Sequence, residues 1–216
     1  MKTIGILIFL LVACSPLKAH TINYELASLP QTDIFWTYLK LGFEHILPLG
    51  LDHILFILSV FFLSSNLKNV VIQATTFTLA HSVTLALAMY GLIKPVPAVV
   101  EPIIALSIFF VAVENLLIRR LKPSRLVVIF AFGLIHGMGF AGALGSLGLP
   151  PGSFTNALVS FNIGVEMGQI AVILLAYLLA AKWFSDKPWY HKRVVQPVSL
   201  LIALTALYWT FERTFV

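Results

Sequence analysis

The residues best suited to do chemistry in this chain are histidines and carboxylates that lie within strongly apolar stretches. Between Gly42 and Leu63, His45 precedes the pair Asp52 and His53, and most of the residues around them are apolar. Three further ionisable residues lie near the middle of later apolar stretches: His81, His136 and Glu166. Ionisable side chains inside hydrocarbon are costly and usually bind ions, carry protons or take part in chemistry. We therefore predict that these six side chains meet in one polar site.

A metal ion is the partner that best fits this set of side chains. Neutral histidines cannot neutralise a carboxylate such as Glu166, whereas a bound cation can. Mixed imidazole and carboxylate ligands suit nickel, zinc and other borderline divalent ions. The predicted ligands of a divalent transition metal, nickel or zinc, are His45, Asp52, His53, His81, His136 and Glu166.

Small residues surround two of these predicted ligands. Gly133 and Gly137 lie beside His136, and glycines also flank Glu166 on both sides. Small residues let helix backbones approach closely within a membrane. We expect this packing to bring the helices that carry His136 and Glu166 within reach of each other. Asn162 lies one helical turn before Glu166 and on the same face.

The composition indicates a membrane protein built from helices. Of the 216 residues, 59% are hydrophobic and 11% are charged, whereas soluble domains are about 45–50% apolar and about 25% charged. Several apolar runs reach the length of about 20 residues that a membrane-spanning helix needs. The net charge of +5 does not indicate nucleic-acid binding, because the basic residues cluster in short loops. We predict an all-α membrane protein.

Six spans can be placed along the chain, and the loops between them orient the bundle. The predicted spans are 46–63, 70–92, 98–118, 126–147, 154–181 and 194–211. The loops 64–69, 119–125 and 182–193 together hold nine Lys and Arg residues, against one in the loops on the other side. Because basic loops stay in the cytoplasm, both the N-terminus and the C-terminus are expected outside.

The N-terminal segment has the pattern of a secretory leader. Residues 1–19 contain a basic start and a short apolar core, and cleavage after Ala19 would remove them as a signal peptide. Two alternatives remain open, which are lipidation of Cys14 and an uncleaved first span. Residues 20–45 are expected to be an extracytoplasmic segment with an aromatic interfacial helix. Residues 46–216 are then the six-helix transmembrane domain.

Three motifs resemble those of the HupE/UreJ family of bacterial membrane proteins. They are residues 42–56 (GFEHILPLGLDHILF), 133–142 (GLIHGMGFAG) and 160–169 (SFNIGVEMGQ). The resemblance implies a multi-pass protein of the bacterial cytoplasmic membrane that acts as a metal permease and supplies nickel to hydrogenase or urease. Metalloenzyme maturation proteins are then expected partners, besides the metal ion and the lipid bilayer.

The same resemblance assigns metal motifs to particular residues. It implies that His45, Asp52 and His53 form the first motif and that His136 matches the histidine of the second. The chain departs from the better-known members in two ways. Six residues instead of five separate His45 from Asp52, and residues 137–144 lack the further histidine and glutamate. The sequence therefore resembles a divergent branch, in which Glu166 could replace the missing carboxylate.

Three functions remain open at this point. In the first, a permease or metal-handling accessory protein captures a cation at the first motif, passes it inward and releases it near Glu114, which lies beside Arg119. In the second, an intramembrane hydrolase uses a histidine-bound zinc to activate water, with Glu166 or Asp52 as the general base. In the third, the polar groups satisfy one another and the protein has a structural or assembly role.

Overall fold

The computed structural model describes residues 30–64, 66–118, 124–147 and 152–216, and this part of the chain is helical without strands. The predicted leader, with Ala19 and Cys14, lies outside the described residues, as does Arg119. The main helices are α3 (Gln31–Ile46), α4 (Leu51–Leu63), α5 (Leu67–Met89), α6 (Pro97–Leu117), α7 (Arg125–Leu147), α8 (Phe154–Ala176) and α10 (Gln196–Phe215). A π-helical turn (Tyr177–Ala181) and α9 (Lys182–Phe184) continue α8, and a second π-helical turn (His191–Val195) precedes α10.

The described helices confirm the predicted all-α membrane fold. Five continuous helical segments are long and apolar enough to cross a bilayer, and a sixth crossing results if α3 and α4 together count as one. Large apolar side chains such as Leu79, Val127 and Leu201 are exposed on the outside of the bundle. Soluble proteins rarely expose such surfaces, whereas lipid covers them in a membrane. Placement of the two termini outside stays a prediction.

The first predicted span is broken near its start. The chain bends by 66° between α3 and α4, and α4 alone has 13 residues, fewer than the roughly 17 that a crossing needs. Pro48 in the break has no backbone N–H to donate to a helix. Gly50 lies against the carbonyl oxygen of His45, so closely that a Cβ atom would clash. The break therefore turns the chain so that His45 at the end of α3 lies beside His53 at the start of α4, with ring centroids 4.5 Å apart.

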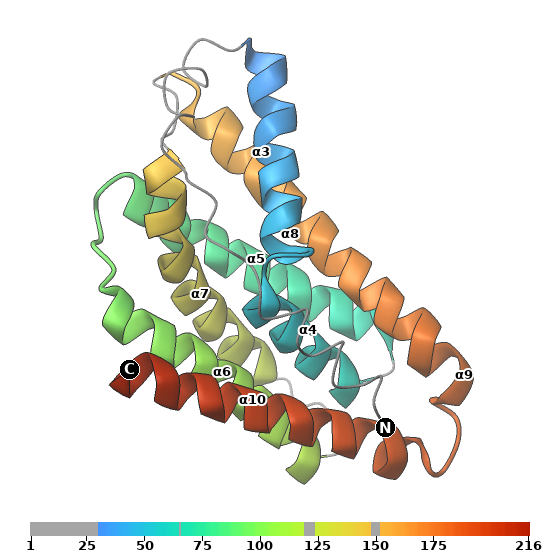
Figure 1. The fold of residues 1–216 in the computed structure, drawn as a ribbon. Helices are drawn as coiled ribbons and strands as arrows, with labels where there is room; N and C mark the ends of the chain where they lie inside the picture. Colours follow the sequence, from blue (N-terminus) through green and yellow to red (C-terminus); the bar gives the residue numbers. More distant parts are fainter. Residues whose placement is uncertain (1–29, 65, 119–123, 148–151) are drawn as a thin grey trace, which may run out of the picture.

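The helices pack mainly in three pairs around α4. Helix α3 lies along α8, α5 lies along α7, and α6 lies along α10, while α4 occupies the middle of the bundle (Figure 1). Phe56, Ile57, Val60 and Phe61 on α4 are buried almost completely. The described part of the predicted extracytoplasmic segment is α3, which buries one face that includes Ile34 and Tyr38.

The glycines of α7 and α8 do not pack these two helices against each other, contrary to the expectation from the sequence. Gly133 and Gly137 lie against the backbone of Phe77 and His81 on α5. The glycines that flank Glu166, Gly164 and Gly168, lie against α3 instead. The expectation that they join the helices of His136 and Glu166 is therefore wrong, because the small faces of α7 and α8 point to different neighbours.

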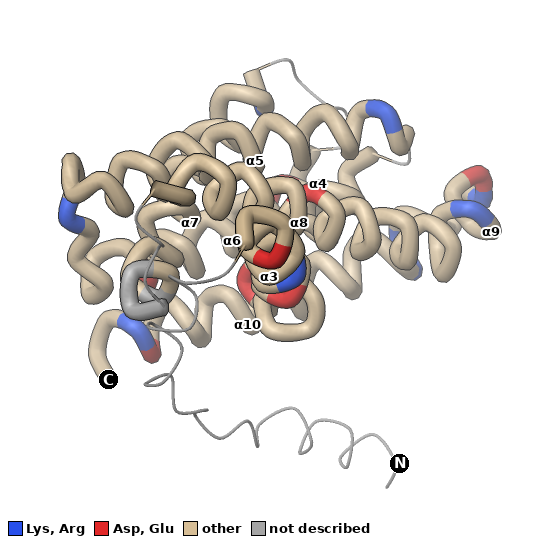
Figure 2. Tube along the Cα trace, turned by 90° about the horizontal axis from the view of Figure 1, so that it is seen from above, with Lys and Arg blue, Asp and Glu red and all other residues tan. Residues whose placement is uncertain are grey.

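Charged residues lie mostly at the ends of the helices. Viewed from above, most Lys and Arg residues lie at helix ends or in the loop after α9 (Figure 2). Near one end, Glu114 pairs with Arg125 at 2.6 Å, and the Arg125 side chain is 2% exposed. Arg125 is thus a partner of Glu114 in the described part of the chain, whereas the proximity of Arg119 to Glu114 stays a prediction. The pair places α6 against the start of α7.

Candidate metal centre

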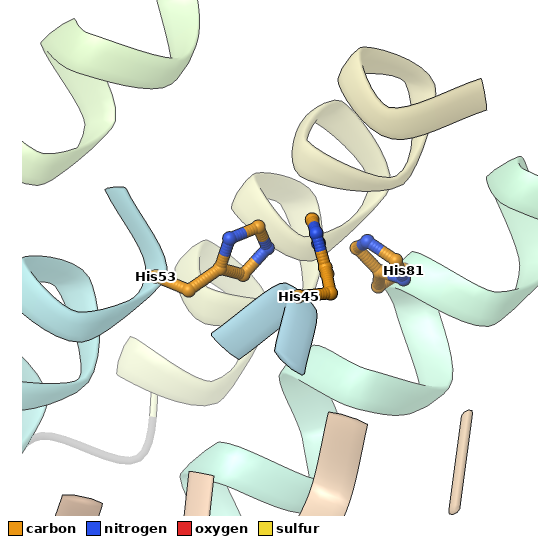
Figure 3. Close-up of side chains that lie close together, drawn as sticks. All are labelled: His45, His53 and His81. Atoms are coloured by element: carbon orange, nitrogen blue, oxygen red, sulfur yellow. The ribbon is translucent and has the colours of Figure 1, made fainter. Parts of the chain in front are cut away.

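Three imidazoles from three helices meet inside the bundle. His45 lies in the last turn of α3, His53 in the first turn of α4 and His81 in the middle of α5. Each offers one ring nitrogen, and these nitrogens lie within 4.8 Å of one another. The three rings form a triangle (Figure 3), with centroids 4.5 Å apart for His45 and His53, 6.0 Å for His45 and His81, and 5.7 Å for His53 and His81. We call His45, His53 and His81 the imidazole cluster.

The spacing of the imidazole cluster is close to that of a metal site. Imidazole nitrogens bind zinc at about 2.0–2.1 Å, so two nitrogens on one tetrahedral ion are about 3.4 Å apart. A contraction of up to about 1.4 Å, which side-chain rotations can supply, would bring all three nitrogens from the 4.8 Å limit to that distance. The break between α3 and α4 makes this geometry attainable, because it positions His45 over the start of α4.

Several nitrogens of the imidazole cluster are buried without a hydrogen-bond partner in the described part of the chain. They are Nε2 of His45, Nε2 of His53 and both ring nitrogens of His81. Buried polar atoms are nearly always paired in folded proteins, and exceptions call for an explanation. Asn162 approaches His81, but its Oδ1 atom makes no well-aligned hydrogen bond. Nitrogen lone pairs gathered in this way are suited to bind a cation.

His136 on α7 lies next to the imidazole cluster. Its ring centroid is 5.1 Å from that of His53, and its Nε2 atom is 2.9 Å from the Ser107 hydroxyl. The same hydroxyl lies 2.7 Å from the carbonyl oxygen of Ile104, and when it donates there, its contact with His136 requires the tautomer in which Nε2 carries the proton. The Nδ1 atom then keeps a free lone pair, and it is buried without a partner among the described groups.

Aromatic side chains surround these histidines. The ring of Phe140 lies 3.8 Å from that of His45, and Phe77 lies 5.0 Å from His136 and 5.8 Å from His53. Phe56 also packs against His136, with ring centroids 5.1 Å apart, and its ring lies 4.7 Å from that of Phe77. These rings restrict the motion of the imidazoles and keep the site apolar, and such a shell controls how solvent reaches a metal site.

The structure pairs Asp52 with an arginine instead of placing it with the histidines. Both carboxylate oxygens of Asp52 accept from the same guanidinium nitrogen of Arg213 on α10, at 3.0 and 3.2 Å. The Asp52 side chain is 30% exposed, so the pair lies at the surface of the site. Sequence reasoning missed Arg213, although a single arginine near the end of an apolar helix is itself a signal of a polar partner.

Glu166 lies at a different place, between α8 and α5. Its Oε1 atom accepts a 2.6 Å hydrogen bond from the Thr75 hydroxyl, and its Oε2 atom is buried without a partner in the described chain. It is not among the groups whose ligand atoms meet in the imidazole cluster. The six predicted side chains are thus distributed over one cluster, one neighbouring histidine, one surface ion pair and one separate carboxylate.

A cavity of about 710 Å³ leads to the histidines. Its lining includes His45, His53 and His136, whereas His81 does not reach it. Among the described residues, the more exposed lining carries one positive side chain, Arg213, and three carboxylates: Glu44, Asp52 and Glu101. A cleft with an excess of negative charge concentrates cations near its wall.

The comparison with known families decides what kind of protein this is. The chain matches the family described as HupE / UreJ protein over residues 21–213. It belongs to the HupE/UreJ family. No curated protein and no solved structure matches it. Membership of the HupE/UreJ family confirms the resemblance carried by the three motifs, and it makes the chain a multi-pass membrane protein that handles metal ions, in a family linked to nickel and cobalt.

Proposed function

We propose that this HupE/UreJ protein is a permease for a divalent transition-metal ion and that the imidazole cluster binds the ion during its passage. The observation that carries the proposal is the meeting of His45, His53 and His81, with ligand nitrogens within 4.8 Å, inside a membrane bundle. Nickel and cobalt are the first ions to test, and zinc is the third because imidazole suits all three.

The cavity supports an approach from the side of the bundle that carries Asp52 and Arg213. Its carboxylates attract the hydrated cation, and the buried nitrogens of His53 and His136 then replace part of the hydration shell. His81 lies behind these two and is fully buried. An ion that moves from the cavity lining to His81 would therefore leave the solvent-accessible part of the site.

Asp52 takes part in this scheme through exchange of its partner. A cation that binds the Asp52 carboxylate competes with the guanidinium of Arg213. Among the described side chains, Asp52 is the ion-pair partner of Arg213. The ligand role predicted for Asp52 stays a prediction and requires that Arg213 move away. The bacterial cytoplasmic membrane as location and maturation proteins as partners likewise stay predictions.

Neither the site nor the family supports the alternative of a zinc-dependent hydrolase. A general base has to lie beside the metal-bound water. Both oxygens of Asp52 contact Arg213, and Glu166 contacts Thr75 away from the imidazole cluster. Transport needs no such base, and it agrees with a family that handles metal ions.

Uptake of radioactive nickel, cobalt and zinc into cells that express the full chain tests the proposal. We expect His53→Ala and His81→Ala to lower uptake of the transported ion at least tenfold at equal abundance in the membrane. His191→Ala is the matched control, because His191 lies in the π-helical turn before α10 and outside the imidazole cluster. Wild-type uptake by both cluster variants would refute the proposed function.

A further inference from the structure

One face of α8 presents three buried oxygen atoms that lack a donor. Asn162, Glu166 and Gln169 follow one another at four-residue and three-residue spacing, so they share a helix face. The Oδ1 atom of Asn162, the Oε2 atom of Glu166 and the Oε1 atom of Gln169 are all buried without a hydrogen-bond partner in the described chain. We call these three residues the acceptor face of α8.

The hydrogen bonds around the acceptor face explain why acceptors, and not donors, are left over. The Thr78 hydroxyl donates to the carbonyl oxygen of Ala74 at 3.2 Å, so its oxygen receives the Gln169 amide at 2.9 Å. This contact uses the NH₂ group of Gln169 and leaves its Oε1 atom free. The NH₂ group of Asn162 is used in the same way, by the carbonyl oxygen of Leu158 at 2.8 Å.

The opposite side of this interface belongs to α5. Thr75 donates to Glu166 at 2.6 Å, Thr78 contacts Gln169, and His81 approaches Asn162. These three α5 residues recur every three positions, so one side of α5 faces the acceptor face. The interface therefore contains a carboxylate, two amide oxygens and two hydroxyls, and one member of the imidazole cluster lies at its end.

The charge at this interface is uncompensated among the described residues. The ion pairs of the described chain involve Glu44, Glu114 and Asp52, but not Glu166. A carboxylate within the hydrocarbon region costs several kcal/mol unless it is paired, protonated or bound to a cation. A set of free acceptors around one carboxylate has the chemistry of a site for a hard or borderline divalent cation.

The position of the interface relative to the imidazole cluster suggests a sequence of sites. Thr75 precedes His81 by six residues on α5, which is about 9 Å along a helix. The displacement is toward the Leu67 end of α5, the end that the basic loops assign to the cytoplasm. Permeation needs neighbouring sites that bind weakly enough for the ion to move on, and oxygen ligands hold a transition metal less tightly than several imidazoles do.

We infer that Thr75, Thr78, Glu166 and Gln169 form a second cation site, lined by oxygen, that receives a divalent transition-metal ion from the imidazole cluster by way of His81 and Asn162. This inference rests on the proposed permease function and adds a second step to it. Glu166 is then a ligand of the inner site and not of the cluster with His45 and His53. The ion exchanges imidazole nitrogens for a carboxylate, an amide oxygen and hydroxyls as it moves inward.

Cobalt binding to the purified full chain in detergent tests the inference, because visible absorption distinguishes nitrogen-rich four-coordinate cobalt from oxygen-rich six-coordinate cobalt. We expect two equivalents of cobalt per wild-type chain and one for Glu166→Gln, which keeps the imidazole-type spectrum. His53→Ala should lose that spectrum and keep the weaker, oxygen-type equivalent. Thr75→Val should weaken only the oxygen-type equivalent, at least threefold.

Two variants serve as matched controls for this titration. Thr76→Val removes an exposed hydroxyl that only contacts the carbonyl oxygen of Ile72, and Glu212→Gln neutralises a carboxylate near the end of α10. Both should bind cobalt as the wild type does. Thr75→Val decides the question if Glu166→Gln fails to fold, as judged by gel filtration.

The two proposals fail in different ways. If the wild type binds one equivalent, which His53→Ala removes and Thr75→Val leaves unchanged, the second site is refuted and the permease proposal stands. The same conclusion follows if ordered water alone occupies the acceptor face and Glu166→Gln keeps the wild-type titration. If His53→Ala changes neither the cobalt spectrum nor metal uptake, the proposed function itself is refuted.

Discussion

Asp52 and Glu166 are two carboxylates on apolar helices, and the structure treats them in opposite ways. Asp52 lies at the cavity, partly exposed, with both oxygens on Arg213. Glu166 lies between α8 and α5, with one oxygen on a threonine and the other buried without a partner in the described residues. A carboxylate paired with an arginine can hold helices together without a bound metal ion. A carboxylate without a positively charged partner is suited to bind a metal ion.

The imidazole cluster and the interface around Glu166 meet at His81. The largest effect on stability is expected from a substitution of Gly137, which packs against His81. A Cβ atom on Gly137 would clash with the carbonyl oxygen of His81 and the hydroxyl of Thr84. Gly137→Ala should therefore push α7 away from α5 and destabilise the protein by about 1–3 kcal/mol. Cobalt binding at the imidazole cluster should weaken as well, because His81 and His136 both move.

Gly142→Ala is the matched control for this change. Gly142 lies on the same helix, and no described atom lies within 4 Å of the position that a Cβ atom would occupy. Unfolding in detergent by added denaturant, followed by circular dichroism, measures the difference between the two variants. Equal stability of Gly137→Ala and Gly142→Ala would show that α7 and α5 do not pack as closely as described.

Neutralising each carboxylate should change metal-free stability in opposite directions. Glu166→Gln removes an unpaired charge from a membrane interface, so we expect a gain of about 1–2 kcal/mol. Asp52→Asn breaks a partly exposed ion pair and should cost about 0–1 kcal/mol. Denaturant unfolding of the metal-free protein measures both changes.

Added metal should reverse the ranking of the wild type and Glu166→Gln. A ligand at free concentration L that binds only the folded state stabilises it by RT ln(1 + L/Kd) at each site, so cobalt should stabilise the wild type more than a variant that lacks one site. A loss of metal-free stability in Glu166→Gln would contradict the description of Glu166 as an uncompensated charge. Glu166 would then stabilise the metal-free protein, as Asp52 is expected to do.

The smallest effect is expected at the cavity wall. Arg213→Gln frees the Asp52 carboxylate, so the affinity of the cavity for cobalt should rise about threefold, while the lost ion pair costs about 0–1 kcal/mol. Arg213→Lys keeps the positive charge and is the control. Equilibrium binding measures the affinity, and a lower affinity in Arg213→Gln than in Arg213→Lys would mean that Arg213 supports metal binding instead of competing with it.

Much of the site could be anticipated from the chain, but its grouping could not. His45, His53 and His81 stand out because a polar side chain is rare in an apolar run, and three of the predicted ligands do meet. The number and depth of the polar side chains do not predict that Asp52 pairs with Arg213, which lies 161 positions away in the sequence. Depth along a helix also leaves open the direction in which a side chain points. The contact of Glu166 with Thr75 could therefore not be predicted from its position in the sequence.

The amino-acid sequence by itself determined the class of this protein: apolar runs of membrane length, basic loops and the three motifs establish a helical metal-handling protein of the HupE/UreJ family. Hydrophobicity acts along the chain and is therefore readable from composition and periodicity. Only the tertiary structure decided which polar groups become neighbours. The bend between α3 and α4 and the pairing of α7 with α5 depend on contacts between distant segments, and these contacts separate the imidazole cluster from Glu166.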